Sequence, residues 1–157
     1  MKRVLDASAL LTGRPFAGEL YTAPEVLPEV RRIGPSASLE AFLETHVTLL
    51  SPGPAAAERV RTASARTGDA PRLSPTDGTL LALALELGAT LVTDDYSIQN
   101  VARSLGIPYE AVMERGIREQ WTWSYRCTGC GKTWPEWHTE CPTCGSRMKT
   151  ARSRQPR

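Results

Sequence analysis

Short apolar runs alternate with longer segments of helical spacing over residues 1–110 of the chain. Three runs predict buried strands, at 3–5, 47–50 and 89–93. The longer segments predict helices at 24–32, 38–46, 55–67, 74–87 and 96–105. Strands that alternate with helices predict an α/β fold, in which a mostly parallel central sheet is flanked by helices.

The helix at 74–87 has the clearest boundaries. Ser74 suits the cap position, Pro75 suits the first turn, and Asp77 stands three residues after the cap. Gly88 predicts its end. Because leucines occur on almost every side of this segment, we expect the helix to be central and buried.

Two other helices carry specific expectations. Pro28 fits the segment 24–32 only if the helix begins near it, because an interior proline removes a hydrogen bond. The segment 38–46 has an apolar stripe that ends at His46. We therefore expect His46 to be partly buried on that face rather than to bind a ligand.

The net charge of +2 over 157 residues conceals an asymmetry. Residues 1–120 hold 12 Lys or Arg against 15 Asp or Glu, a net of −3, whereas 121–157 hold 7 against 2, a net of +5. All four cysteines and all four tryptophans also lie in 121–157. We predict an acidic domain at 1–120, a small cysteine-rich module at 121–150 and a basic disordered tail at 151–157.

The overall composition excludes two broad classes. With 41% hydrophobic and 23% charged residues, the chain has the composition of a globular protein rather than a disordered one. No apolar run approaches the roughly 20 residues that a membrane span needs. Asp6 interrupts the apolar start of the chain, so we expect no secretory peptide, no membrane partner and a cytoplasmic location.

The four cysteines form two pairs, Cys127-x2-Cys130 and Cys141-x2-Cys144, separated by ten residues and each followed by glycine. A two-residue gap lets both thiolates of a pair reach one tetrahedral ion, and glycine permits the tight turn around the sulfurs. Four thiolates complete a structural site, so we predict one structural Zn²⁺ in a small β zinc ribbon. Two disulfides are the alternative, which the absence of an export signal disfavours. His138 is expected at the surface, because the ligand set is already full.

Aromatic and basic residues are mixed in this module. Trp121, Trp123 and Tyr125 occupy every second position, so we expect their side chains to lie on one face of a strand. Core packing, or docking to the larger domain, is the expected role of the first two. Trp134 and Trp137 have two open interpretations, core packing or base stacking. If the two rings stack on bases, they form an RNA-binding surface with the nearby basic residues Lys132, Arg147, Lys149 and Arg152.

Carboxylates follow two of the predicted strands. Asp6 comes directly after the first, and Asp94 and Asp95 follow the strand at 89–93. If these strands are parallel neighbours, the carboxylates meet at the carboxyl edge of the sheet, where open α/β sheets place their sites. Several carboxylates in one cleft repel one another unless a cation neutralises them, and Mg²⁺ or Mn²⁺ suits such oxygen ligands.

Each further acid has a structural alternative. Asp77 supports a helix start, and Asp94 or Asp95 could begin the next helix, where negative charge is favourable. Glu25 and Glu29 lie four apart, on one face of a helix that could simply be solvated. Asp6 alone, at the end of an apolar strand, has no such structural explanation.

Four stretches, taken in order, resemble the PIN-domain nucleases. They are VLDASAL at 4–10, YTAPEV at 21–26 with Glu29 and Val30, LSPTD at 73–77, and LVTDDYSIQNVA at 91–102. With a zinc ribbon following, residues 1–150 resemble the archaeal branch of the Nob family, which matures the 3′ end of small-subunit ribosomal RNA. The specific part is 93–102 together with the four cysteines, because toxin ribonucleases share the general PIN pattern.

The resemblance implies which acids bind metal. They fall on Asp6, Glu29, Asp77 and the pair Asp94 and Asp95. Asp95 fits the family's Thr-x-Asp pattern, and Asp94 is the alternative. Pro28, directly before Glu29, departs from the pattern, so Glu25 also remains an alternative.

The resemblance also implies a function. It implies an endoribonuclease with one or two catalytic Mg²⁺ or Mn²⁺ ions that acts on precursor rRNA in the small ribosomal subunit precursor. The basic ribbon would grip the RNA while the acidic domain brings the scissile strand to the metal. Two alternatives stay open: a toxin-type PIN ribonuclease that acts on other RNA, and a non-catalytic rRNA-binding assembly factor that uses only the ribbon and tail.

Overall fold

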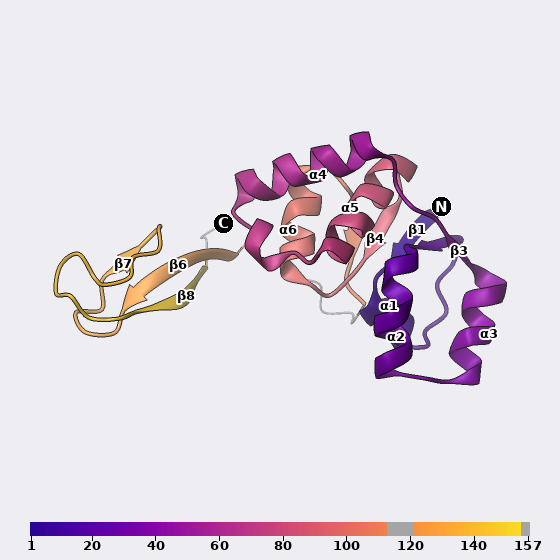
Figure 1. Cartoon of the computed structure of the whole chain (residues 1–157), viewed down its shortest axis with the longest axis horizontal. Coiled ribbons are helices and arrows are strands. Elements are labelled where there is room, and N and C mark those ends of the chain that lie inside the picture. The colour runs from indigo at the N-terminus through magenta and orange to yellow at the C-terminus, as the bar shows by residue number, and fades with distance from the viewer. Residues whose placement is uncertain (113–120, 155–157) are drawn as a thin grey trace. The chain divides into compact units, whose positions relative to one another are not determined.

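The computed structural model of the chain describes residues 1–112 and 121–154, with the backbone alone at 121–123 and 152–154 (Figure 1). The chain divides into two compact units, Met1–Gly116 and Ile117–Arg157. Each unit is described by itself. The boundary predicted at residue 120 lies outside the described residues.

Unit 1 contains a five-stranded parallel sheet. Its strands are β1 (Lys2–Leu5), β2 (Glu19–Thr22), β3 (Val47–Leu49), β4 (Thr90–Val92) and β5 (Tyr109–Glu110). They lie in the order β3-β2-β1-β4-β5, and every neighbouring pair is parallel. The three predicted strands are confirmed. The other two, β2 and β5, were not predicted, because β2 has only two apolar residues, Leu20 and Tyr21, and β5 is two residues long, so neither forms an apolar run.

The helices of unit 1 connect these strands. They are α1 (Ala7–Leu11), α2 (Leu27–Ile33), α3 (Ala37–His46), α4 (Pro54–Thr67), α5 (Pro75–Leu87) and α6 (Tyr96–Ser104), with short 3₁₀ turns η1 (Pro24–Val26) and η2 (Ala70–Arg72). Figure 1 shows α4, α5 and α6 as one group and α1, α2 and α3 as another. All five predicted helices form. The predicted helix at 24–32 divides into η1 and α2, and Pro28 lies in the first turn of α2, as its fixed backbone angle requires.

One prediction on α3 is wrong. His46 was expected to be partly buried, but its side chain is exposed. Its ring stacks on Phe42, with 5.4 Å between the ring centroids. The stripe on α3 therefore ends in a surface stack, with Leu43 as its buried member.

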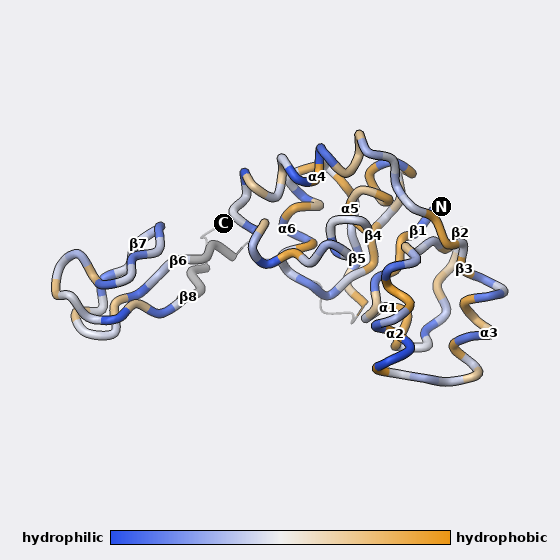
Figure 2. The backbone as a smooth tube through the Cα atoms, viewed as in Figure 1, coloured by the Kyte–Doolittle hydropathy of each residue, from blue (hydrophilic) through white to orange (hydrophobic). Residues whose placement is uncertain are grey.

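The core of unit 1 is built around α5. Leu80, Leu81 and Leu83 are at most 1% exposed, and α5 packs against β1, β4, α4 and α6. Figure 2 shows the hydrophobic stretches concentrated in the strands and in α5. The predicted start of this helix is confirmed as a capping box, in which Ser74 and Asp77 each bond the other's backbone N–H. Gly88 ends it with φ of 60°, a left-handed conformation that glycine adopts without strain.

Unit 2 is a three-stranded antiparallel sheet. β6 (Trp121–Cys127) lies between β7 (Thr133–Trp134) and β8 (Met148–Arg154). The prediction of a disordered tail from residue 151 is wrong for 151–154. These residues extend β8, because their backbone pairs with Trp121 to Ser124 of β6 in continuous register. Residues 155–157 lie outside the described part of the chain.

Among the described residues, no helix combines the length and the apolar character needed to cross a bilayer.

A stability measurement tests the central place of α5. We expect Leu81→Ala to lower the free energy of unfolding of unit 1 by about 3 kcal/mol, because it leaves a cavity in a fully buried site. Urea unfolding of the full chain, followed by far-UV circular dichroism, reports on the helices, which among the described residues all lie in unit 1. Leu49→Ala is the control: Leu49 is 45% exposed, so its loss should cost less than about 1 kcal/mol. Equal effects of the two changes would contradict the buried position of α5.

Candidate functional site

Asp6 stands where β1 ends and α1 begins. Its backbone N–H donates to the carbonyl of Val92 at 3.2 Å, which extends the pairing of β1 with β4 by one residue. Its carboxylate caps α1: Oδ1 accepts from the Ser8 hydroxyl at 2.7 Å and from the Ala9 N–H at 2.8 Å. Asp6 is 6% exposed, and its carboxylate lies between the end of a strand and the start of a helix. The expectation that Asp6 has no structural explanation is therefore wrong, because it caps α1, a helix that the sequence did not predict.

The acids after β4 have different backbone partners. Asp95 caps α6, and its Oδ1 accepts from the N–H groups of Ser97 at 2.8 Å and Ile98 at 3.2 Å. Asp94 Oδ1 accepts from the N–H of Val112 at 2.8 Å, on the segment that follows β5. The structural alternative for Asp95, a helix start, is therefore confirmed. The same holds for Asp77, whose Oδ2 accepts from the Ser74 N–H at 2.8 Å.

These structural roles do not remove the acids from a common site. A pocket of about 200 Å³ at the carboxyl edge of the sheet is lined by five acids, Asp6, Glu29, Asp77, Asp94 and Asp95. The predicted gathering of these carboxylates is therefore observed. Glu25 and Glu29 are both exposed, but only Glu29 lines the pocket, so of the two glutamates considered for this role the structure places Glu29 there.

The donor set of this pocket fits a hard divalent cation. All of its charged groups are carboxylates, and oxygen ligands of this kind suit Mg²⁺ and Mn²⁺. Among the described residues, the four cysteines are the one group of three or more metal-binding side chains whose ligand atoms all lie within 4.8 Å of one another. The carboxylates of the pocket do not form such a group, so their oxygens are more widely spaced. That spread suits Mg²⁺, which usually keeps several waters and binds through only one or two carboxylates.

Burial acts on the charge of Asp6. Desolvation raises the pKa of Asp6 above its ordinary value, and the charge of Asp94 acts in the same direction. Hydrogen bonds from Ser8, Thr93 and Ala9 oppose this shift by favouring the carboxylate. The ionised form of Asp6 is therefore costly until a positive charge lies nearby.

Three polar residues that support the acids were not singled out from the sequence. Ser8 bonds Asp6, as described above. Thr93 is fully buried and accepts the Asp95 N–H on its hydroxyl at 3.1 Å. Gln99, 5% exposed, donates from Nε2 to the Thr93 carbonyl at 2.7 Å. All three fall within the stretches that resemble PIN nucleases, which was the available signal.

The four cysteine sulfurs of unit 2 gather at one point. They all lie within 4.8 Å of one another, with Cys127 and Cys144 at 3.3 Å and Cys130 and Cys141 at 3.7 Å. Four sulfurs at about 2.3 Å from one zinc in a tetrahedron would be separated by about 3.8 Å. All four are free thiols, so the alternative of two disulfides is not what the structure contains.

The surroundings of the sulfurs raise the pKa of one cysteine and lower that of another. The Ser146 hydroxyl and backbone N–H lower the pKa of Cys144 to about 6. At Cys130 the Lys132 N–H favours the thiolate, but desolvation and the other three sulfurs outweigh it and raise the pKa to about 11. Four thiolates this close repel one another, and a cation among them would relieve that repulsion.

Gly129, inside the first cysteine pair, was not singled out from the sequence. A Cβ at this position would collide with the Ser146 side chain and lie 3.2 Å from Cys144 Sγ. The close approach of the two cysteine turns therefore requires glycine here. The two predicted glycines, Gly131 and Gly145, have φ of 75° and 73°, which confirms the tight turns after each pair.

The aromatic residues of unit 2 separate into two groups. Trp134 is half-buried and packs with Tyr125 against Cys127, Cys141 and Met148, so it belongs to the small core. Trp137 is 55% exposed and meets Tyr125 edge-on at 5.3 Å. The side chains of Trp121 and Trp123, expected to pack or dock, lie outside the described residues. His138 is half-buried against the ring of Trp134 rather than fully at the surface.

Basic side chains lie on the strands that surround the cysteines. Lys149 on β8 is directly opposite Arg126 on β6, so the two share one face of the sheet, and both are exposed. Arg126 was not singled out from the sequence. Lys132 and Arg147 are also exposed, whereas the side chain of Arg152 lies outside the described residues.

Known proteins resemble this chain in both of its units. Residues 4–87, more than half of the chain, match the family model described as a PIN domain of ribonuclease. The chain is 40% identical to "Endoribonuclease Nob1" of Methanothermobacter thermautotrophicus, over 98% of this chain and 95% of that protein. It is 38% identical to "Endoribonuclease Nob1" of Pyrococcus abyssi, over 99% and 96%. It is also 37% identical to "Ribonuclease VapC1" of Thermoplasma acidophilum, over 93% and 76%.

The parallel sheet with an acidic pocket at its carboxyl edge is thus the PIN domain of a ribonuclease. Because the similarity extends through the cysteine-rich unit, the chain belongs to the Nob1 family of endoribonucleases.

Replacement of the buried carboxylate should alter stability in a pH-dependent way. Without added divalent ions, we expect Asp6→Asn to be more stable than the wild type at pH 8, because it removes a buried charge and keeps an N-cap acceptor. Since the pKa of Asp6 is raised, the wild type gains stability as the pH falls and Asp6 takes up a proton. The difference should therefore shrink toward pH 4.

Thermal unfolding, followed by far-UV circular dichroism across this pH range, measures the difference. Glu25→Gln is the matched control, because Glu25 is exposed and should change the free energy of unfolding by less than about 0.5 kcal/mol. A variant Asp6→Asn that is less stable than the wild type at pH 8 would show that the charge is not costly in the folded protein.

Proposed function

We propose that this chain is a divalent-metal-dependent endoribonuclease that cleaves precursor small-subunit rRNA at its 3′ end during ribosome biogenesis. The observation that carries the proposal is the acidic pocket of a PIN domain, in a chain whose similarity to proteins named endoribonuclease Nob1 spans both units. Precursor rRNA, within the small ribosomal subunit precursor, is the proposed partner.

Asp6, Asp77 and Asp95 are the proposed ligands of one or two Mg²⁺ or Mn²⁺ ions, and Glu29 and Asp94 complete the negative charge of the pocket. A divalent ion held there would supply the activation of water and the stabilisation of the leaving oxygen of a phosphodiester. Backbone N–H groups hold one oxygen of Asp6, Asp77 and Asp95 in place. The carboxylates are therefore oriented before substrate arrives, which avoids reorganisation during the reaction.

Unit 2 is proposed to fold around one structural Zn²⁺ held by Cys127, Cys130, Cys141 and Cys144. Its exposed basic residues, Arg126, Lys132, Arg147 and Lys149, are proposed to contact RNA phosphates. Trp137 is exposed enough to stack on a base, whereas Trp134 supports the core. This arrangement supports a grip on RNA that is separate from the acidic pocket.

A toxin-type ribonuclease is the second candidate. Its support is the similarity to "Ribonuclease VapC1", which covers 93% of this chain. The two candidates differ in substrate and share the catalytic pocket. The choice of RNA in a cleavage assay separates them.

Cleavage of a precursor rRNA fragment with an extended 3′ end tests the proposal. With Mn²⁺ present, we expect the wild type to cut at one position and Asp6→Asn or Asp95→Asn to lose at least about 100-fold in rate, because each change removes a carboxylate at the reacting centre. Gel analysis of the labelled fragment gives both the position and the rate.

The matched control is a pair of equivalent glutamate changes. Glu29→Gln should lose activity, and Glu25→Gln should keep it, because only Glu29 lines the pocket. Equal activity of the wild type and Asp6→Asn would refute the site. Equally fast cleavage of transfer or messenger RNA would favour the toxin-type enzyme, and RNA binding without cleavage would favour an assembly factor.

Metal analysis tests the role of unit 2. We expect one zinc per chain and its loss in Cys130→Ser, because that variant lacks one of the four ligands. Chelation should change the tryptophan fluorescence, since all four tryptophans lie in 121–157, and should leave the helical circular dichroism signal unchanged. Restoration of the fluorescence by zinc and not by magnesium is the control. A zinc-free chain with unaltered fluorescence would contradict the proposal.

A further inference from the structure

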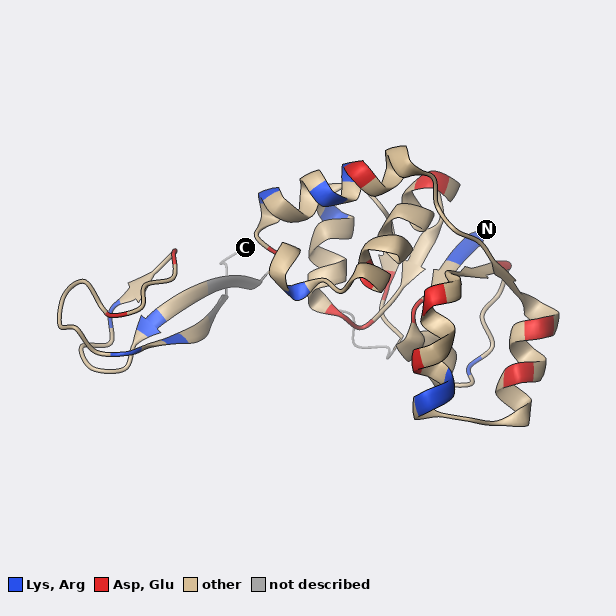
Figure 3. Ribbon diagram, in the orientation of Figure 1, with Lys and Arg blue, Asp and Glu red and all other residues tan. Residues whose placement is uncertain are grey.

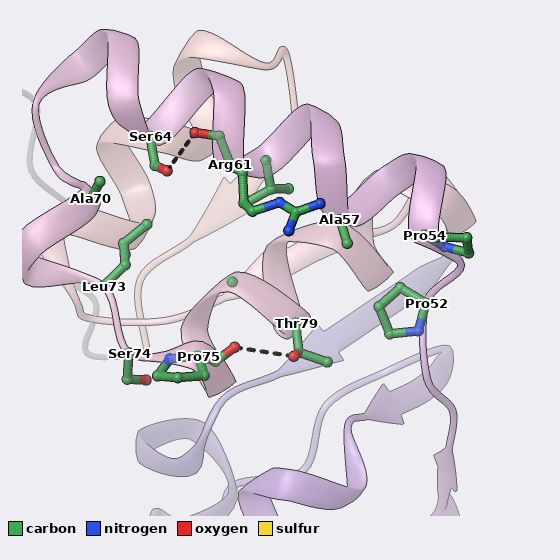
Figure 4. Close-up of a pocket in the computed structure, with 12 residues that line it drawn as sticks. Pro52, Pro54, Ala57, Arg61, Ser64, Ala70, Leu73, Ser74, Pro75 and Thr79 are labelled. Atoms are coloured by element: carbon green, nitrogen blue, oxygen red, sulfur yellow. Dashed lines mark hydrogen bonds between the residues drawn. The ribbon is translucent and has the colours of Figure 1, made fainter.

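The first turn of α5 separates the acidic pocket from a second hollow. Thr76 and Asp77 line the acidic pocket. On the same turn, Ser74 and Pro75 line a cavity of about 600 Å³ that reaches across to α4 (Figure 4). The residues that line the two hollows lie on opposite faces of α5. The hollows are therefore separated by about the diameter of a helix with its side chains, roughly 10–12 Å, a distance that a short stretch of RNA can cross.

The walls of this cavity combine apolar surface with a few polar groups. Pro52, Pro54 and Leu73 contribute apolar side chains. The Thr79 hydroxyl donates to the Pro75 carbonyl at 3.0 Å, which leaves its oxygen able to accept a hydrogen bond. Ser74 Oγ accepts the Asp77 N–H at 3.1 Å, which leaves its proton able to donate. Apolar walls with a few donors and acceptors suit a flat heterocycle with polar edges.

Arg61 brings positive charge to the cavity wall, and the two segments that border the cavity, α4 and η2, carry more. Four exposed arginines lie on α4 and η2, namely Arg59, Arg61, Arg66 and Arg72. Figure 3 shows the basic positions of α4 gathered along the helix. Two acids lie in the same segment: Glu58 is exposed, and Asp69 is buried and accepts a hydrogen bond from Asn100 at 2.6 Å. This positive charge favours a polyanion such as RNA over a neutral or basic partner.

Arg61 is the arginine that lines the cavity itself. Its guanidinium lies over the space between α4 and α5 in Figure 4. It forms an ion pair with Glu58 in which both side chains are more than 60% exposed. Exposed pairs of this kind contribute little, so Arg61 can exchange Glu58 for a phosphate at small cost.

We propose that this cavity binds one nucleobase of the RNA substrate, next to the phosphate that lies at the acidic pocket. The base enters between the prolines and α5, and Arg61 contacts the adjoining phosphate. The cavity would then select the nucleotide beside the cut. This inference rests on the proposed ribonuclease function.

Gly78 offers a precise test. It lines the cavity, and a Cβ added there meets no atom within 4 Å, so a larger side chain can occupy the cavity without a clash at the backbone. Gly78→Phe fills the space, and Gly78→Ala is the matched control, which adds only a methyl group. Circular dichroism melting of both variants checks that α5 is intact.

Binding is measured in the full chain with Asp6→Asn, which prevents cleavage, on a single-stranded RNA that covers the precursor cleavage site. Versions of this RNA each lack one base. With Gly78 present, we expect the loss of one particular base beside the cut to weaken binding about tenfold. Gly78→Phe should bind the intact RNA about tenfold more weakly and show no further loss at that position, whereas Gly78→Ala should behave like Gly78.

A second variant tests the proposed phosphate contact of Arg61. Arg61→Gln should reduce the slope of log affinity against log salt concentration by about one, the signature of one lost phosphate contact. The inference would be overturned if, with Gly78 present, removal of no single base weakened RNA binding. It would also be overturned if Gly78→Phe still lost affinity on removal of that base. Failure of the proposed function is seen separately, as absence of precursor cleavage by the chain with Asp6 intact.

Discussion

The parallel pairing of β1 with β4 is the constraint on which the acidic pocket depends. Leu5 lies opposite Val92, and the Asp6 N–H continues the ladder to the Val92 carbonyl. Two segments more than 80 residues apart therefore end at the same edge of the sheet, with a carboxylate directly after each. A one-residue change of register would turn the alternating side chains to the opposite face. The register thus fixes which acids can share a pocket.

The side chains that cap three helices of this domain are also the proposed metal ligands. Asp6 caps α1, Asp95 caps α6, and Asp77 closes the capping box of α5. Each carboxylate therefore faces backbone N–H groups, whose partial positive charge lowers the cost of placing several negative groups together. The cost is not removed, because desolvation still raises the pKa of Asp6. A bound cation would stabilise the domain and complete the site at the same time.

Unit 2 meets a different constraint, that of a core too small to fold by apolar contacts alone. Among the side chains that the structure describes in this unit, Cys127, Cys141 and Met148 form the buried cluster, supported by Tyr125 and Trp134. Two of the three are proposed zinc ligands, so the metal would form the centre of the unit rather than an addition to it. Gly129 allows the two cysteine turns to approach closely enough for this. The strands around this centre then present exposed basic residues to solvent.

The sequence by itself determined the α/β class, five of the six α-helices described in the first unit, the four-cysteine site, and the acids of the pocket apart from the choice between Glu25 and Glu29. These features depend on local patterns, such as Ser74-Pro75-Thr76-Asp77 and the doubled Cys-x2-Cys spacing, which a chain shows before it folds. Only the tertiary structure decided between Glu25 and Glu29, extended β8 to Arg154, and opened a cavity between α4 and α5. Those outcomes depend on strand pairing and on how helices pack, which bring together residues far apart in the chain, so no local pattern records them.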